Sequence, residues 1–340
     1  MLELPEILPS VRMGAASLWA VANLGLFCLC EPMSRRIFTW TDHQLDKLNK
    51  VKEILEDLKD YKPLTLRQVY YQLVGKGFIE NRVSQYGMLS NLLKWARIEG
   101  FISWDDIEDR VRVFHDLTGW DRSETFVKVS LGRFLTGYKR DLLQTQDKLI
   151  EVWIEKDALS SVFTRVAERY TIPVVVCRGF SSVSFLNDFR ERIEAHKGKA
   201  PLMLYFGDFD PSGMEMLEAM QTTLRDELGM NGIEFKRVAL KKEDIFTYKL
   251  PHNPDALKKT DTRAKKHLEA YGKLAVELDA LRPDVLEQKI KDGIETELDI
   301  NLFNIEVRKN NKEVRKLNQM KATVEKFFKK EEGMLFLVEI

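Results

Sequence analysis

The spacing of apolar residues divides the chain into a helical first part and a later part in which predicted strands alternate with helices. In residues 42–60, leucines and valines recur every three or four positions, as on one face of an amphipathic helix. A second helix is expected after Thr65, a good N-cap residue, and a third from about Ser84 to Glu99. The alternating run from Arg110 to Asp116 then predicts a strand. This order is typical of a winged helix-turn-helix domain, a shape that often binds nucleic acid.

From about residue 146, short apolar runs alternate with helical segments. Four strands are predicted, at residues 148–155, 172–177, 201–208 and 233–240. Helices between them predict a parallel sheet covered on both faces. Charged helices follow near the C-terminus. We therefore expect a mixed α/β chain with a winged-helix domain at 33–145 and a parallel α/β sheet domain at 146–340 that ends in a helical extension.

The first 32 residues contain a stretch that does not fit this scheme. Gly14 to Cys30 carries no charge over 17 residues, which also suits a signal peptide or a short membrane anchor. Met33 then opens a polar segment of the kind with which many proteins begin. A start site assigned too far upstream is the favoured interpretation, and a packed accessory helix or membrane targeting stays open. We treat residues 1–32 as an extension without a role in the chemistry.

Composition restricts the possible functions. The 340 residues include three cysteines, too few for a disulfide framework and without zinc-ligand spacing, so a reducing, cytoplasmic setting without a membrane is expected. Lysine plus arginine and aspartate plus glutamate both number 53. Any affinity for nucleic acid must therefore come from local basic patches.

Acidic residues end two of the predicted strands. Glu155 follows the first strand, and Asp208 and Asp210 follow the third, with Phe209 between them free to point the other way. Ligands of open parallel sheets bind at the carboxyl ends of the strands, so these carboxylates are expected to meet there. Mg²⁺, or Mn²⁺ in its place, would neutralise their mutual repulsion. The alternative is that both aspartates only cap the helix that begins at Pro211.

Two adjacent tyrosines lie on the second predicted helix. A helical projection places Tyr70 on the apolar face and Tyr71 outside it, one turn from Arg67. Tyr71 is therefore expected to be exposed. An arginine beside a phenol favours the phenolate and can hold a phosphate, as a nucleophile that attacks a phosphodiester requires. The alternative is a tyrosine that only contacts nucleic-acid backbone or a partner.

Taken together, these motifs resemble a known family. The order "WIEKDAL", "CRGF" and "GDFDPSG" is similar to the Toprim domain of the topoisomerase VI A subunit and its meiotic double-strand-break relatives, and "LRQVYY" resembles their Arg-x-x-Tyr-Tyr motif. The run "VELDAL" at Val276–Leu281 extends the likeness. The resemblance implies that Tyr71, aided by Arg67, attacks double-stranded DNA and stays joined to its 5′ end. Glu155, Asp208 and Asp210 would hold Mg²⁺.

The resemblance also implies partners. In the family, the tyrosine of one protomer works with the metal site of the other, so a homodimer is expected. Strand passage would need a separate ATPase subunit, because the sequence contains no P-loop motif. Association with the nucleoid follows from DNA binding. A basic cluster could contact phosphates or simply form a solvated helix face: Lys258, Lys259, Arg263, Lys265 and Lys266.

Several functions stay open besides the transesterase. A Toprim-type nuclease or nickase would use water in place of Tyr71. The D-x-D pair also suits a phosphohydrolase of the haloacid dehalogenase kind, although there it normally ends the first strand of its domain. The last alternative is a non-catalytic DNA-binding relative.

Overall fold

The computed structural model describes residues 38–108, 119–120, 122–179, 181–253, 257 and 262–335. Three predictions lie outside these residues: the extension 1–32, the strand at Arg110–Asp116, and the positions of Lys258 and Lys259.

The N-terminal part, residues 38–108, contains the three helices that the sequence predicts. They are α1 (Asp42–Asp57), α2 (Leu66–Gly75) and α3 (Val83–Ile98). Thr65 caps α2 as predicted: its Oγ1 accepts a hydrogen bond from the Gln68 N–H at 3.1 Å, and the Gln68 side chain accepts one from the Thr65 N–H at 2.8 Å. Two short strands, β1 (Leu64–Thr65) and β2 (Ile107–Glu108), pair in parallel beside these helices.

The second part is built on the predicted parallel sheet. Its strands are β3 (Lys148–Ile154), β4 (Val174–Val176), β5 (Ala200–Phe206) and β6 (Glu234–Ala239). All three pairings are parallel, and the order is β4-β3-β5-β6. The chain passes from β3 to β4 on one side and then crosses to β5 on the other. The topological switch point therefore lies between β3 and β5.

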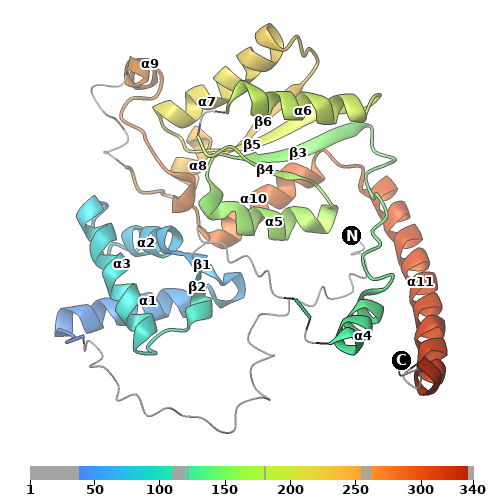
Figure 1. The fold of residues 1–340 in the computed structure, drawn as a ribbon. Coiled ribbons are helices and arrows are strands. Elements are labelled where there is room, and N and C mark those ends of the chain that lie inside the picture. The colour runs from blue at the N-terminus through green and yellow to red at the C-terminus, as the bar shows by residue number, and fades with distance from the viewer. Residues whose placement is uncertain are drawn as a thin grey trace.

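Helices cover both faces of the sheet, which confirms the prediction (Figure 1). Val152 and Ile154 of β3 point to one face and pack in a cluster with α5 (Ser160–Ala167) and α10 (Pro283–Glu295). Trp153, between them, points to the other face and packs with α6 (Val183–Ala195) and α7 (Pro211–Thr222). This alternation is the reason that the second half of β3 is apolar on both faces.

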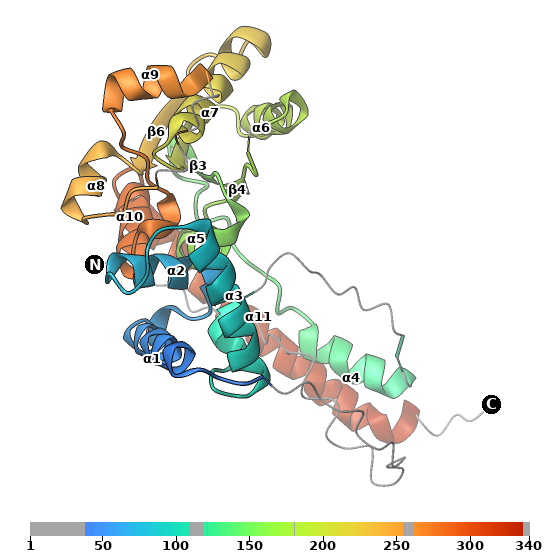
Figure 2. The same cartoon turned by 90° about the vertical axis from the view of Figure 1, so that its left-hand side faces the viewer.

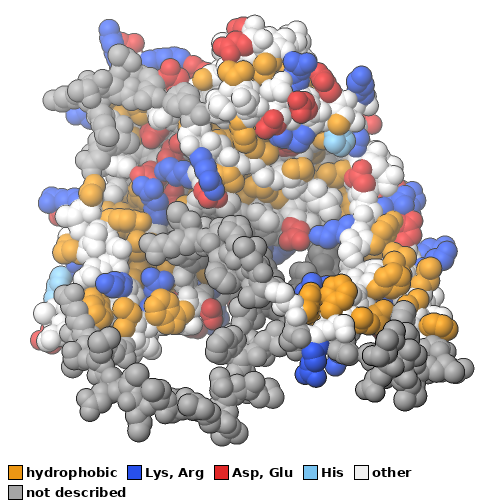
Figure 3. All heavy atoms as spheres, in the orientation of Figure 1, with side chains coloured by type: hydrophobic (Ala, Val, Ile, Leu, Met, Phe, Trp, Pro, Cys, Tyr) orange, Lys and Arg blue, Asp and Glu red, His pale blue; other side chains and the backbone are white. Residues whose placement is uncertain are grey.

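Four further α-helices complete the described part of the chain. They are α4 (Ser123–Arg133), α8 (Lys242–Thr247), α9 (Thr262–Tyr271) and α11 (Ile300–Leu335). Helices α4 and α11 lie side by side in an arm that extends from the sheet (Figures 1 and 2). Apolar and basic side chains mix on the surface of this arm (Figure 3, lower right). No helix in the described part of the chain combines the length and apolar composition needed to cross a bilayer.

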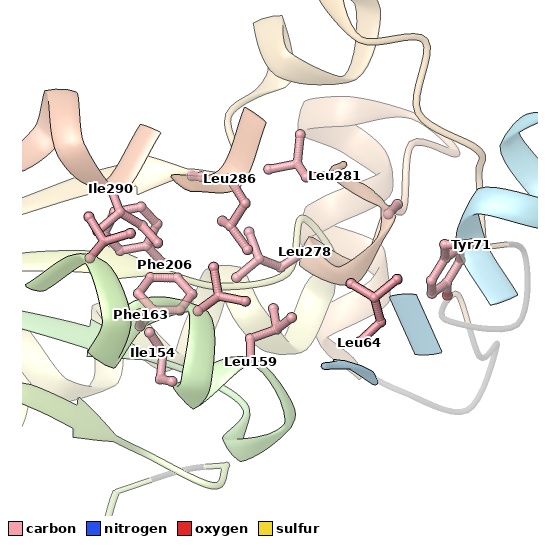
Figure 4. Packing of buried hydrophobic residues seen from close by; sticks show 14 of the residues in the cluster. Leu64, Tyr71, Ile154, Leu159, Phe163, Phe206, Leu278, Leu281, Leu286 and Ile290 are labelled. Carbon is pink, nitrogen blue, oxygen red and sulfur yellow. The ribbon is translucent and has the colours of Figure 1, made fainter. Parts of the chain in front are cut away.

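One hydrophobic cluster joins the N-terminal part to the sheet. It runs from α1 and α2 through Leu64 and Tyr71 to Leu278 and Leu281, and on to the buried face of the sheet (Figure 4). Leu278 begins a short 3-10 turn, Leu278–Ala280, that lies between α2 and the sheet. The two parts are therefore packed together rather than connected only by a linker.

Candidate functional site

Glu155 and Asp208 meet at the switch point of the sheet. Glu155 follows β3, Asp208 follows β5, and both are buried. The Asp208 N–H donates to Glu155 Oε2 at 2.9 Å. Gly213 makes this approach possible, because a Cβ there would lie 2.5 Å from the Asp208 carbonyl oxygen and 2.8 Å from Glu155 Oε2.

Asp208 and Asp210 have different roles in the structure. Asp210 is the N-cap of α7, and its Oδ1 accepts a hydrogen bond from the Gly213 N–H at 2.7 Å. The capping interpretation is therefore right for Asp210. It is wrong for Asp208, whose Oδ1 accepts a hydrogen bond from the Leu278 N–H at 2.9 Å.

A segment distant in sequence brings two further carboxylates to this edge. Phe209 and Val276 exchange backbone hydrogen bonds of 2.9 and 3.0 Å, which place Glu277 and Asp279 beside Asp208. Both acids belong to the "VELDAL" run, but their convergence with the other acids was not predicted. The Phe209–Val276 pairing that produces it leaves no periodic signal in the sequence.

Lys156 lies at the centre of these acids. Its ammonium forms ion pairs with Asp208 Oδ2, with Glu277 Oε2 at 2.9 Å and with Asp279 Oδ2 at 3.9 Å. Burial disfavours the charged lysine, but the three carboxylates outweigh it and raise the pKa of Lys156. Lys156 is therefore an ammonium that neutralises part of the acidic cluster.

Crowding and burial perturb the acids themselves. Burial, with the nearby charge of Asp208, raises the pKa of Glu155 to about 7, although the Asp208 N–H opposes the shift. Burial also raises the pKa of Asp210. For Glu277, burial acts in the same direction, but the charges of Lys156 and Arg67 outweigh it and lower the pKa. Several carboxylates with pKa values driven apart at one sheet edge are typical of a functional site.

The structure places Tyr71 and Arg67 at this same acidic edge, but it corrects the expected exposure of Tyr71. Only 3% of Tyr71 is exposed, because the Leu278–Ala280 turn covers the side of α2 that the helical projection left open. The Tyr71 phenol interacts electrostatically with the Glu277 carboxylate. Arg67 forms an ion pair with Glu277 at 2.9 Å. Tyr70 is buried as predicted, with its hydroxyl 3.1 Å from Asn81 Oδ1.

The expected phenolate character of Tyr71 is also wrong for this conformation. Burial raises its pKa above the ordinary value, and the negative charge of Glu277 adds to that shift. Arg67 acts in the opposite direction but does not outweigh them, because it is itself paired with Glu277. Tyr71 is therefore a neutral phenol here.

The donor types suit a hard divalent cation, but the present arrangement holds an ammonium. Carboxylate oxygens are the ligands that Mg²⁺ and Mn²⁺ prefer. Within residues 38–335, as far as they are described, no three acidic, histidine or cysteine side chains are arranged to hold a metal ion. Even so, both oxygens of Asp279 are buried and lack a hydrogen-bond partner among the described residues. The chemistry of the acids thus fits a cation, while Lys156 lies between them.

Arg237 supports the loop that carries the aspartates, and sequence reasoning missed it. Its guanidinium donates to the backbone oxygens of Gly207 at 3.0 Å, Gly213 at 3.1 Å and Leu240 at 2.8 Å, and also to that of Asp208. Burial lowers its pKa, although negative groups nearby oppose the shift. The sequence gives little signal for this role, because Arg237 is one of three charged residues in the six-residue strand β6.

Part of the predicted basic cluster lies on α9. Lys265 and Lys266 are exposed there, Arg263 belongs to the same helix, and Lys266 forms an ion pair with Glu218 of α7 at 2.6 Å. The ring of His267 on α9 contacts that of Phe209, with centroids 5.6 Å apart. These lysines therefore lie on a helix that packs against the D-x-D segment.

Comparisons with known proteins add no assignment. No model of a known protein family matches the chain, and no curated protein matches it.

Proposed function

We propose that the protein is a divalent-cation-dependent, DNA-cleaving transesterase that resembles the topoisomerase VI A subunit, with a winged-helix domain and a Toprim domain. One observation carries the proposal: Arg67 and Tyr71 from α2 lie against the edge where Glu155 and Asp208 meet. These residues are far apart in sequence, yet Glu277 pairs with Arg67 and with Lys156, each at 2.9 Å, and Lys156 in turn contacts Asp208. A nucleophile, a phosphate-binding cation and acidic metal ligands are the parts that phosphodiester cleavage requires.

In the proposed reaction, Tyr71 Oη attacks a backbone phosphorus of double-stranded DNA. The Oη–P bond forms, the bond from phosphorus to the 3′ oxygen breaks, and the 3′ oxygen takes a proton from solvent. Glu277 is the proposed acceptor of the phenol proton, since its carboxylate already interacts with the Tyr71 phenol. Arg67 would turn from Glu277 to the phosphate. Glu155, Asp208 and Asp210 would hold the Mg²⁺ or Mn²⁺ that neutralises charge developing on the phosphate.

Tyr71 must become accessible before it can react. In the present conformation it is 3% exposed, so DNA binding has to separate α2 from the Leu278–Ala280 turn. A homodimer, in which α2 of one chain serves the acids of its partner, would allow such an exchange and belongs to this proposal. A separate ATPase subunit is also part of this proposal. Lys265 and Lys266 would contribute non-specific phosphate contacts.

The test is the detection of a covalent protein–DNA adduct. Purified protein is incubated with Mg²⁺ and duplex or supercoiled DNA labelled at the 5′ or 3′ end, and then denatured. Retention of the 3′-labelled strand on the protein is expected, with loss in Tyr71→Phe and Asp208→Ala. Tyr70→Phe is the matched control and should keep the adduct, since the Tyr70 hydroxyl hydrogen-bonds Asn81 and the backbone oxygens of Glu80 and Arg82. An adduct that survives in Tyr71→Phe would refute the assignment.

A hydrolytic nuclease is the second candidate. The burial of Tyr71 and its raised pKa favour a reaction in which water attacks and the tyrosine only contacts DNA. In that case, the same assay should give nicked DNA without an adduct, and Tyr71→Phe should retain the nicking.

A further inference from the structure

The acidic edge contains one carboxylate whose environment is unexplained by the proposed ligand set. Asp279 is 1% exposed, and neither of its oxygens has a hydrogen-bond partner among the described residues. Buried carboxylates are normally paired, because an unsatisfied buried charge is strongly destabilising. Within the described part of the chain, the ion pair of Asp279 is with Lys156, and its 3.9 Å separation is too long for a hydrogen bond.

Lys156 is held much more closely by the neighbouring acids. Its ammonium contacts Asp208 directly and lies 2.9 Å from Glu277 Oε2. It thus lies between the D-x-D segment on one side and the Glu277–Asp279 segment on the other. The Lys156 ammonium lies between acids from both segments, with Arg67 paired to Glu277 beside it, and Asp279 is the acid that Lys156 contacts least closely.

We propose that Asp279 is an additional ligand of a divalent-cation site, and that the Lys156 ammonium occupies this site until a cation displaces it. The inference rests on the proposed function, because it concerns the metal site of that same reaction. The unpartnered oxygens of Asp279 then have a purpose, since a divalent ion in place of the Lys156 ammonium would give them the partner that they lack. A flexible lysine side chain can withdraw from such a position without a change in the backbone.

The position of Asp279 supports this role. The Leu278 N–H donates to Asp208 Oδ1 at 2.9 Å, so the backbone immediately before Asp279 is fixed to a proposed metal ligand. Phe209 and Val276 hold the same segment through two backbone hydrogen bonds. Asp279 is therefore placed by the protein and not by the cation, as a ligand with a low reorganisation cost must be.

The test measures cation binding directly, without reference to DNA. The full chain is stripped of metal with EDTA, dialysed, and titrated with MnCl₂ while the electron paramagnetic resonance signal of free Mn²⁺ is recorded. Asp279→Asn should weaken Mn²⁺ binding by roughly tenfold or more, as the loss of a supporting metal-site group commonly does. Lys156→Met should tighten binding by about tenfold, because it removes a like charge from the site.

Two matched controls keep the test specific. Asp244→Asn removes a buried acid that is paired with Lys289 at 2.6 Å, and Lys148→Met removes a lysine at the opposite end of β3 that is paired with Glu297 at 2.5 Å. Both should bind Mn²⁺ as the wild-type protein does. Circular dichroism in EDTA establishes that each variant is folded, and the Lys156→Met arm still tests the inference if Asp279→Asn does not fold.

The outcomes separate this inference from the proposed function. Unchanged binding in Asp279→Asn, unchanged or weaker binding in Lys156→Met, or no Mn²⁺ binding in any variant would overturn the inference. Binding that depends on Asp279 and Lys156 as expected supports it, even if no DNA is cleaved and the proposed function fails. Conversely, adduct formation that is unaffected by Asp279→Asn would leave the transesterase intact and exclude Asp279 from the site.

Discussion

Replacement of Asp279 by asparagine should stabilise the metal-free protein at neutral and basic pH. Burial raises the pKa of Asp279 from its ordinary 3.8 to about 6, although Lys156 and Arg67 oppose the shift. A difference of this size corresponds to about 3 kcal/mol of unfavourable free energy when the group is ionised in the folded chain. Asparagine has nearly the same shape and carries no charge, so it should remove this penalty.

The sign and the pH window follow from the direction of the shift. Because the folded-state pKa is raised, the unfolded chain ionises first, and ionisation favours unfolding. The penalty is absent below about pH 4, grows between pH 4 and 6, and is constant above pH 7. The stabilisation by Asp279→Asn should follow the same course. At pH 8 it should raise the melting temperature by roughly 5–10 °C.

The assay is urea and thermal unfolding of both proteins in EDTA, at several pH values from 4 to 8. Asp244→Asn is the control: its acid has a close partner in Lys289, so the substitution should not stabilise the chain. The reasoning would be refuted if Asp279→Asn unfolded more easily than the wild type at pH 8. It would also be refuted if its advantage did not shrink toward pH 4.

Three further substitutions test the loop and the junction by urea unfolding. Gly213→Ala should destabilise the chain by about 1–3 kcal/mol, because its Cβ would approach a backbone oxygen to 2.5 Å. The control is Gly87→Ala, on the exposed side of α3 with open space around it, which should be neutral or stabilising. Equal changes in the free energy of unfolding for the two variants would contradict this prediction. Arg237→Met should cost roughly 3–5 kcal/mol, since it removes the buried guanidinium that donates to four backbone oxygens. A loss under 1 kcal/mol would show that water replaces it. Asp57→Asn breaks an ion pair with Arg282 in which the side chains of Asp57 and Arg282 are 42% and 39% exposed. The free energy of unfolding should therefore fall by less than about 1 kcal/mol, and a larger fall would contradict the view that this exposed pair contributes little.

Local patterns predicted the parts of the site that strands and caps determine. Glu155 and Asp208 end neighbouring strands, and parallel strands present their carboxyl ends at one edge, so their meeting could be read from order alone. The start of α2 was equally predictable, because Thr65 and Gln68 have the spacing of a capping box.

The rest depends on contacts between distant segments. The helical projection treated α2 as a helix with one covered side, whereas the Leu278–Ala280 turn covers a second side and buries Tyr71. Similarly, Lys156 appears in the sequence only as the residue after Glu155. Its role as a counter-ion became visible once the Phe209–Val276 pairing had placed Glu277 and Asp279 around it.

The continuous hydrophobic cluster between α2 and the sheet has a consequence for how the molecule responds to stress. Leu64 and Tyr71 share a dry interior with Leu278 and Leu281, so heat or denaturant that loosens one part exposes apolar surface of the other. The described chain should therefore melt in one cooperative step, as a single thermodynamic unit. Any partner that uncovers Tyr71 must itself supply apolar or electrostatic contacts that replace those it disrupts, and a mere collision with DNA will not suffice.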